Sequence, residues 1–133
     1  MNECEMLPVF TLMGTRIMDY LNEQLYTYKA YITAVYDGDT VTANIDLGMG
    51  VWKNKEKLRL HRINAPEVRG DSKEQGMVSR DWLRDRILDK HVIVRTTHDK
   101  KGKYGRYLAE VWHEGENLSD LLVTKGLAVY KEY

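Results

Sequence analysis

KLRLHRINAPE, at residues 57–67, combines a strand pattern with a turn pattern. At positions 58–61 two leucines alternate with an arginine and a histidine, which is the period-two pattern of a half-buried strand. Pro66 interrupts this pattern, because its ring fixes φ, removes the backbone donor and disfavours a helical conformation in the residue before it. The stretch therefore predicts a strand that ends in a turn.

Three polar side chains in this stretch are of the kinds used in chemistry on phosphates. Arg59 lies on the expected strand, Asn64 offers an amide oxygen near its end, and Glu67 follows in the turn. A cation can take up phosphoryl charge, a carboxylate can activate water, and oxygen atoms can hold a metal ion. The simpler interpretation is an ion pair at the end of a surface strand, which contributes little energy.

The composition is that of one soluble globular domain. A chain of 133 residues is long enough to bury a core, and no apolar run is long enough to span a membrane. The one cysteine, Cys4, excludes an intramolecular disulfide. Glu3 and Glu5 stand where a signal peptide needs positive charge, so we expect a cytoplasmic protein.

The formal net charge of zero conceals a basic middle. Residues 1–52 carry 2 basic and 7 acidic side chains, residues 53–106 carry 16 and 8, and residues 107–133 carry 2 and 5. A basic segment between acidic ends favours a face that binds a polyanion. Runs of charge are also common on solvated surfaces, and we favour that interpretation for the arginines at positions 80–86.

The rest of the chain predicts a mainly β domain with helices (α+β). We expect strands at residues 27–36, 40–47, 51–63, 92–97 and 106–112, a helix at about 73–88, and a short helix that ends at 124. Ser72 with Gln75 resembles a capping box for the first helix, with Asp71 as the competing cap, and Asn117 or Ser119 would cap the second. Five short strands, with one helix after the third and another after the fifth, are typical of an OB-type Greek-key barrel.

Residues 1–26 form an accessory segment in front of the domain at residues 27–133. Apolar side chains at three- and four-residue spacing predict an amphipathic helix in it: Leu12, Met13, Ile17, Met18, Leu21 and Leu25. Such a stripe must be buried somewhere. We expect residues 14–25 either to cover apolar barrel surface or to pair with a second chain, which would make a homo-oligomer.

Two further turns carry charged side chains. Asp37-Gly38-Asp39-Thr40 connects the first two expected strands, and Asp-Gly is a strong hairpin signal, so its aspartates taken alone are turn residues. Lys103-Tyr104-Gly105-Arg106 taken alone is an exposed hairpin. Together with residues 57–67, however, these turns supply two arginines from different strands, whose guanidinium groups suit phosphate oxygens, and carboxylates from two turns.

Four separated motifs resemble those of the staphylococcal (micrococcal) nuclease, or thermonuclease, family. They are D-G-D-T at 37–40, R-L-H-R-I-N-A-P-E at 59–67, K-Y-G-R-Y-L-A at 103–109 and K-G-L-A at 125–128, in the family's order. The resemblance covers about residues 28–130. It implies a calcium-dependent endonuclease on an OB-fold barrel, hydrolysing DNA, RNA or both with little sequence specificity. We expect residues 27–133 to lack a counterpart of the family's C-terminal helix.

The resemblance also implies three ligands for calcium. Asp39 matches a carboxylate ligand, and Asn64 stands where the family's founding member has a second aspartate. Ala65 stands where the backbone carbonyl is the ligand, which any residue can offer. Because calcium affinity depends on the charge of the ligands, Asn64 in place of an aspartate predicts weaker binding.

The remaining matched residues concern catalysis and substrate. Glu67 matches the glutamate assigned as general base for the attacking water. Arg59 and Arg106 match the two arginines that hold the phosphate and stabilise the transition state. The resemblance also implies substrate contacts for Lys103 and Tyr104, and for Tyr130 or Tyr133 as a base-stacking ring.

The alternative is a non-catalytic OB-fold module that binds nucleic acid or a protein partner. Such modules of the family are recognised by loss of the arginines or of the glutamate. Arg59, Glu67 and Arg106 are all present here, which favours the enzyme.

Overall fold

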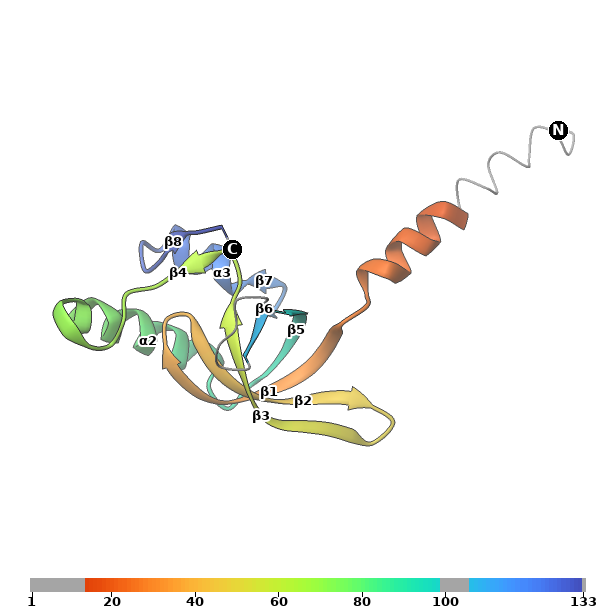
Figure 1. Cartoon of the computed structure of the whole chain (residues 1–133), viewed down its shortest axis with the longest axis horizontal. Coiled ribbons are helices and arrows are strands. Elements are labelled where there is room, and N and C mark those ends of the chain that lie inside the picture. Colours follow the sequence, from red (N-terminus) through yellow and green to blue (C-terminus); the bar gives the residue numbers. More distant parts are fainter. Residues whose placement is uncertain (1–13, 99–105, 133) are drawn as a thin grey trace, which may run out of the picture.

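The computed structural model describes residues 14–98 and 106–132. Figure 1 shows a barrel of strands with one long helix against it and an N-terminal helix that points away. The strands are β1 (Thr27–Asp37), β2 (Thr40–Gly48), β3 (Val51–Leu60), β4 (Ile63–Asn64), β5 (His91–His98), β6 (Tyr107–His113), β7 (Glu116–Asn117) and β8 (Val129–Tyr130). The helices that follow β1 are η1 (Gly70–Ser72), α2 (Lys73–Ile87) and α3 (Leu118–Thr124).

Five of these strands close into a barrel. The order is β3-β2-β1-β5-β6, all antiparallel neighbours, and a parallel pairing of β3 with β6 closes the ring, with Leu60 opposite Ala109. Helix α2 lies between β4 and β5 in the chain, and α3 follows β7. This topology confirms the prediction of an OB-type barrel with mixed α and β structure.

The barrel interior is filled by alternating aliphatic side chains. On β2, for example, Val41, Ala43 and Ile45 are buried while the residues between them are partly exposed. Leu83 and Ile87 of α2 are fully buried and join the same core. Burying one such side chain contributes about 1.5–3 kcal/mol, so α2 is fixed to the barrel mainly through this face.

The third strand is shorter than predicted. It ends at Leu60 instead of continuing to Ile63, because the chain turns at Arg62, whose φ of 69° lies in the left-handed region. Ile63 and Asn64 then form β4, which pairs with β8 in a separate two-stranded sheet. The sequence pattern did not indicate this turn, since no glycine or proline marks it.

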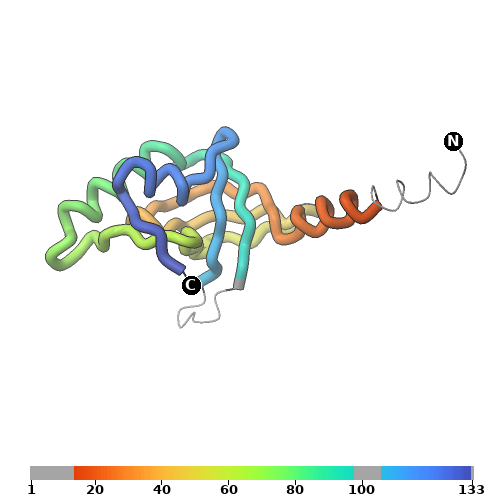
Figure 2. Tube along the Cα trace, turned by 90° about the horizontal axis from the view of Figure 1, so that it is seen from above, coloured from red at the N-terminus to blue at the C-terminus, as the bar shows by residue number. Residues whose placement is uncertain are grey.

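The N-terminal helix covers residues 14–23 and does not pack on the barrel. Every residue from 14 to 26 is exposed, including Ile17 and Leu21, with 55% and 51% of their surface accessible. Figure 2 shows the helix continuing away from the barrel in a second view. The expectation that it covers barrel surface of its own chain is therefore wrong. Its pairing with a second chain, and the division of the chain at residue 26, stay predictions.

No helix in the described part of the chain combines the length and the apolar character that crossing a bilayer requires.

A network around Arg62 ties β8 to the barrel. Arg62 donates hydrogen bonds from Nε and Nη2 to Glu110 on β6, and from Nη1 to Asp120 on α3 at 3.1 Å. The Tyr130 hydroxyl donates to Asp120 Oδ1 at 2.9 Å. The hydrogen bonds that Asp120 accepts lower its pKa below the ordinary value of 3.8, and the bond from Arg62 has the largest effect.

Asp120→Asn should make the protein less sensitive to acid. The lowered pKa means that the Asp120 carboxylate stabilises the fold above about pH 4, and that this contribution is lost as the pH falls through the lowered pKa. The side chain is half exposed, so we expect the contribution not to exceed about 1 kcal/mol. The check is the difference in Tm between pH 7 and pH 3, with Asp19→Asn on the exposed N-terminal helix as control. Equal differences in both variants would contradict this role.

Candidate active site

The turn between β1 and β2 holds two buried carboxylates. Asp37 Oδ1 accepts a hydrogen bond from the Asp39 backbone N–H at 3.0 Å, which closes the turn. Asp37 and Asp39 are only 8% and 5% exposed. Burial, helped by the hydrogen bond with Asp39 and by its charge, raises the pKa of Asp37 to about 6. The turn therefore concentrates negative charge just under the surface.

Asp39 connects this turn to two distant segments. Its Oδ2 atom accepts from the Ala65 backbone N–H at 2.8 Å and lies 3.1 Å from Nη2 of Arg59. Its Oδ1 atom accepts from the Thr40 hydroxyl at 3.1 Å. One carboxylate thus joins the β1–β2 turn, β3 and the segment after β4.

Arg59 is buried, contrary to the simple alternation of its strand. It is 5% exposed between the fully buried Leu58 and Leu60, because β3 pairs with β2 and β6 at this end. Its Nη2 atom also donates to Asn64 Oδ1 at 3.2 Å, and Nη1 donates to the Leu60 carbonyl at 3.1 Å. The guanidinium group is therefore held in one orientation by an anion and two neutral oxygens.

Glu67 and Arg106 line a groove of about 480 Å³ beside this cluster. Glu67 is exposed, and its ion pair with Arg69 is long, at 4.0 Å, with both side chains more than 70% exposed. The Nε atom of Arg106 is buried and has no hydrogen-bond partner among the described residues. The groove therefore offers an available carboxylate and an available guanidinium donor.

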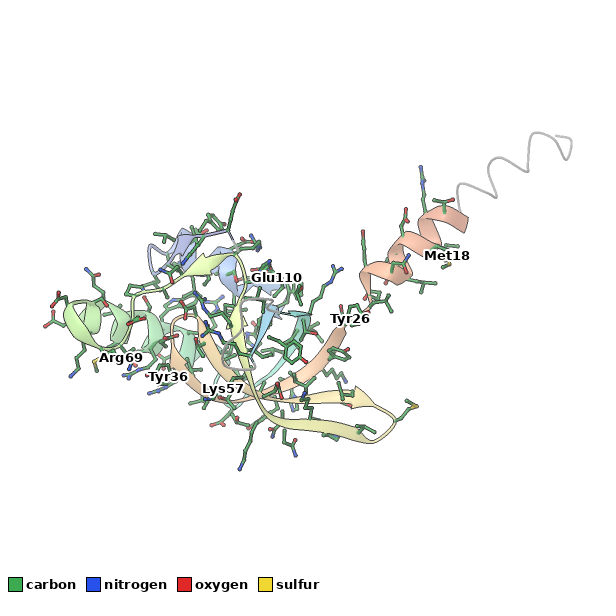
Figure 3. The ribbon with its side chains drawn as sticks, viewed as in Figure 1. Met18, Tyr26, Tyr36, Lys57, Arg69 and Glu110 are labelled. Atoms are coloured by element: carbon green, nitrogen blue, oxygen red, sulfur yellow. The ribbon has the colours of Figure 1, made fainter. Side chains whose placement is uncertain are left out.

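Residues of β1, β2 and β3 and of the segment before η1 complete the groove. The other lining residues are Ala34, Val35, Tyr36, Asp37, Thr40, Thr42, Lys57, Val68 and Arg69. Figure 3 marks it by Tyr36 at the end of β1, Lys57 on β3 and Arg69 before α2. Thr40 links the groove to the bonded cluster. It lines the groove, and its hydroxyl donates a hydrogen bond to Asp39 in the cluster. It also lies opposite Arg59 in the pairing of β2 with β3.

The structure brings together most of the predicted site residues. Asp39, Arg59, Asn64 and Ala65 form one bonded cluster, with Glu67 and Arg106 in the neighbouring groove. It does not bring Tyr130 there: this ring lies in a separate hollow with His61, Arg62, Lys131 and Glu132. Lys103, Tyr104 and Tyr133 lie outside the described residues. The individual roles of all these side chains stay predictions.

Helix α2 positions Glu67, which the sequence patterns did not suggest. A Cβ atom at Gly76 would lie 2.1 Å from the Glu67 carbonyl oxygen, so the helix touches the backbone of this turn directly. The Ser72 hydroxyl donates to the same carbonyl at 3.1 Å and makes no helix cap, so the expected capping box is wrong. The available signal was Gly76 itself, because glycine inside a helix costs about 1 kcal/mol and usually has a packing reason.

Oxygen atoms are the only metal donors that the cluster offers. Asp39 gives a carboxylate, Asn64 an amide oxygen and Ala65 a backbone carbonyl, and calcium prefers oxygen ligands. Within residues 14–98 and 106–132, no three histidine, cysteine, aspartate or glutamate side chains are grouped so that they could hold a metal ion. A calcium ion at this cluster would therefore need water or substrate oxygens as further ligands.

Comparison with known proteins supports the same family that the motifs indicate. The family model described as staphylococcal nuclease homologue matches residues 57–133. The chain is 31% identical over 115 residues to a thermonuclease of Staphylococcus hyicus, and the alignment covers 84% of this chain and 62% of that protein. It is 36% identical over 104 residues to an uncharacterized endonuclease of Haemophilus influenzae, covering 77% and 52%.

A thermonuclease of Staphylococcus intermedius is 30% identical over 105 residues, covering 77% of this chain and 59% of that protein. The chain thus spans about half to three-fifths of the length of these curated relatives. The family match covers more than half of the chain, and the barrel topology agrees with it. The chain belongs to the family of staphylococcal nuclease homologues.

Proposed function

We propose that this protein hydrolyses phosphodiester bonds of DNA, RNA or both. The observation that carries the proposal is the groove in which Glu67 and Arg106 lie beside the bonded cluster of Arg59, Asp39 and Asn64. The relatives named thermonuclease and endonuclease support it. No side chain in this set reads a base, so little sequence specificity is expected.

Glu67 is the general base in this proposal. A general base must be ionised at the working pH and must reach the proton that it removes. Glu67 is exposed at the groove, and its ion pair with Arg69 is too long and too exposed to hold it firmly. Its carboxylate can therefore take the proton of a water molecule that attacks a phosphate bound in the groove.

The two arginines bind and stabilise the phosphoryl group. Arg106 has a buried Nε–H without a partner among the described residues, which is costly unless a ligand accepts from it. Arg59 is oriented in advance by Asp39 and Asn64, so little reorganisation is needed when charge develops on the phosphate. The two groups differ in role: Arg106 is the open donor and Arg59 the fixed one.

We propose calcium as the cofactor. The oxygen donors of the cluster suit it, and the two buried carboxylates at Asp37 and Asp39 form a site that a cation would stabilise. Asp39, Asn64 and the Ala65 carbonyl would hold the ion, which would neutralise charge on the phosphoryl oxygens. Asp39 is also ion-paired with Arg59, and Asn64 accepts a hydrogen bond from it, but a carboxylate or amide oxygen has more than one lone pair for such sharing.

Asn64→Asp should strengthen calcium binding. The substitution adds one negative charge at a proposed ligand, beside the Arg59 guanidinium, and ligand charge sets calcium affinity. We expect the calcium Kd to fall by roughly tenfold, measured by titration calorimetry of the protein without nucleic acid. Asn54→Asp, at an exposed position of β3, is the control and should leave Kd unchanged. An unchanged Kd in Asn64→Asp would argue against Asn64 as a ligand.

Gly76→Ala should weaken both the fold and the activity. The added methyl group meets the Glu67 carbonyl at 2.1 Å, so α2 or the turn must move. Overpacking of this kind costs about 1–3 kcal/mol, and displacement of Glu67 should lower kcat by more than about tenfold. Thermal unfolding and steady-state kinetics measure the two effects.

The matched control for Gly76→Ala is Met77→Ala, one position further along the same helix, where the side chain is 36% exposed. We expect its kcat to be close to that of the natural protein. Equal kcat values for the two variants would mean that α2 does not position Glu67.

A digestion assay tests the proposed function. The full chain is incubated with single-stranded DNA, duplex DNA and RNA in the presence of calcium, and release of acid-soluble fragments is followed. Fragments of many lengths from at least one polymer are the expected result. Binding without cleavage under every condition would instead indicate the non-catalytic OB-fold module.

A further inference from the structure

We propose that one end of the groove binds a single-stranded segment of nucleic acid, with Tyr36 stacked on an unpaired base and Lys57 on the neighbouring phosphate. This inference rests on the proposed function and names the form of substrate that the same site prefers. It is carried by two side chains, from β1 and β3, that neither the motifs nor the hydrolytic mechanism uses.

Tyr36 has a large aromatic side chain that is exposed to solvent. It is 56% exposed, although it directly precedes the buried Asp37. The pairs of rings and the cation–ring contacts within the described residues do not include it. An exposed ring at the wall of a groove is a ready surface for a base, because every base has a flat face that can stack.

The floor of the groove between Tyr36 and Lys57 is made of small side chains. Ala34 on β1 pairs with Thr42 on β2, and Thr42 pairs with Lys57 on β3, so these three residues form a row across the sheet. Thr40 lies further along β2 in the same groove. Since strands lie about 4.8 Å apart, β1 and β3 are separated by roughly 10 Å across this floor. The groove volume of about 480 Å³ is that of a small-ligand pocket.

Lys57 is available for a phosphate. Its side chain is exposed, and it makes no ion pair within the described part of the chain, whereas Lys53 on the same strand pairs with Glu56 at 3.6 Å and lies over the Tyr107 ring. Arg69 and Arg106 add positive charge to the same groove, which Asp37 and Glu67 also line. A backbone phosphate beside the stacked base can therefore pair with a cation of the groove.

The arrangement favours unpaired nucleic acid. In a duplex the faces of the bases are already covered by stacking, and taking a base out of the stack costs a few kcal/mol. A single strand offers the base face and the phosphate together. Because Tyr36 and Glu67 line one groove, the stacked base would belong to a nucleotide close to the phosphate that is cut.

Binding measurements test this inference separately from cleavage. All proteins carry Glu67→Gln, so that labelled oligonucleotides stay intact with calcium present, which a gel verifies. Fluorescence anisotropy then gives Kd for a twelve-nucleotide oligothymidine and for a hairpin duplex. The test variants are Tyr36→Leu, Tyr36→Phe and Lys57→Gln, and the control is Tyr20→Leu, an equally exposed tyrosine on the N-terminal helix.

We expect Tyr36→Leu to raise the single-strand Kd roughly 5- to 100-fold, because base stacking on an aromatic ring contributes about that much to affinity. The single-strand Kd of Tyr36→Phe and of Tyr20→Leu should stay within about threefold of the parent value. The duplex Kd should change little in all three tyrosine variants. Lys57→Gln should lower the slope of log Kd against log salt concentration by about 1, the change expected when one phosphate contact is lost.

An unchanged single-strand Kd in Tyr36→Leu, or an equal loss on the duplex, would overturn the inference. If the natural chain cleaves nucleic acid while Tyr36→Leu binds normally, only the inference fails. If binding depends on Tyr36 but the natural chain cleaves nothing, only the proposed function fails. If the Glu67→Gln parent binds neither oligonucleotide and the natural chain cleaves nothing, both fail.

Discussion

Arg59→Met is expected to reduce both the stability and the activity of the protein. The guanidinium group is 5% exposed and lies 3.1 Å from the equally buried Asp39, so its loss leaves a buried carboxylate without its cation. Breaking such a pair costs about 3–5 kcal/mol, which should lower Tm by roughly 10 °C or more. The loss of an oriented donor at the phosphate should lower kcat by at least about 10³-fold.

Arg106→Met separates the two effects. Arg106 is partly exposed, and its buried Nε–H has no hydrogen-bond partner among the described residues, so little folding energy depends on it. We expect kcat to fall by about 10²–10³-fold while Tm changes by less than about 2 °C. Thermal unfolding and steady-state kinetics of both variants make the comparison. Full activity in Arg59→Met, or an equal loss of Tm in both variants, would contradict the assignment of one fixed and one open arginine.

Glu67→Gln is expected to lower kcat by about 10²–10⁴-fold with almost no effect on folding or on substrate binding. The amide has nearly the shape of the carboxylate but cannot accept the proton of the attacking water. Glu67 is exposed, and its ion pair with Arg69 is 4.0 Å long, so its charge adds little to stability. Tm and KM should therefore stay close to those of the natural chain.

Glu74→Gln is the matched control, because Glu74 is an exposed glutamate in the first turn of α2, just past the same segment. Its kcat should equal that of the natural chain. If Glu67→Gln retains full kcat, another group removes the proton and the assignment of the base is wrong.

Local sequence patterns predicted most of the barrel. Alternation along β1 and β2, the Asp-Gly turn between them and the apolar face of α2 each depend on residues close together in the chain. Asn117 caps α3, and Gly126, with φ of 73°, follows its end, as their residue types indicate. These features follow from local geometry, which a sequence contains directly.

The features that were missed depend on contacts between distant segments. Alternation alone would leave Arg59 on the outer side of its strand, but closure of β3 on β6 and the Asp39 turn bury it. The direct contact of Gly76 with Glu67, and the hydroxyl of Ser72 bonding back to that turn, arise only when α2 docks. Likewise, the groove between Tyr36 and Lys57 exists because β1, β2 and β3 pair in one register.

The most direct test of metal-assisted hydrolysis is cleavage of one labelled single-stranded oligonucleotide by the natural chain and by Glu67→Gln, purified side by side, each with calcium and with a chelator. Metal-assisted hydrolysis at this groove predicts fragments only from the natural chain with calcium, a result that also excludes a contaminating nuclease as their source. Equal cleavage by Glu67→Gln, or undiminished cleavage in chelator, would contradict metal-assisted hydrolysis at this groove.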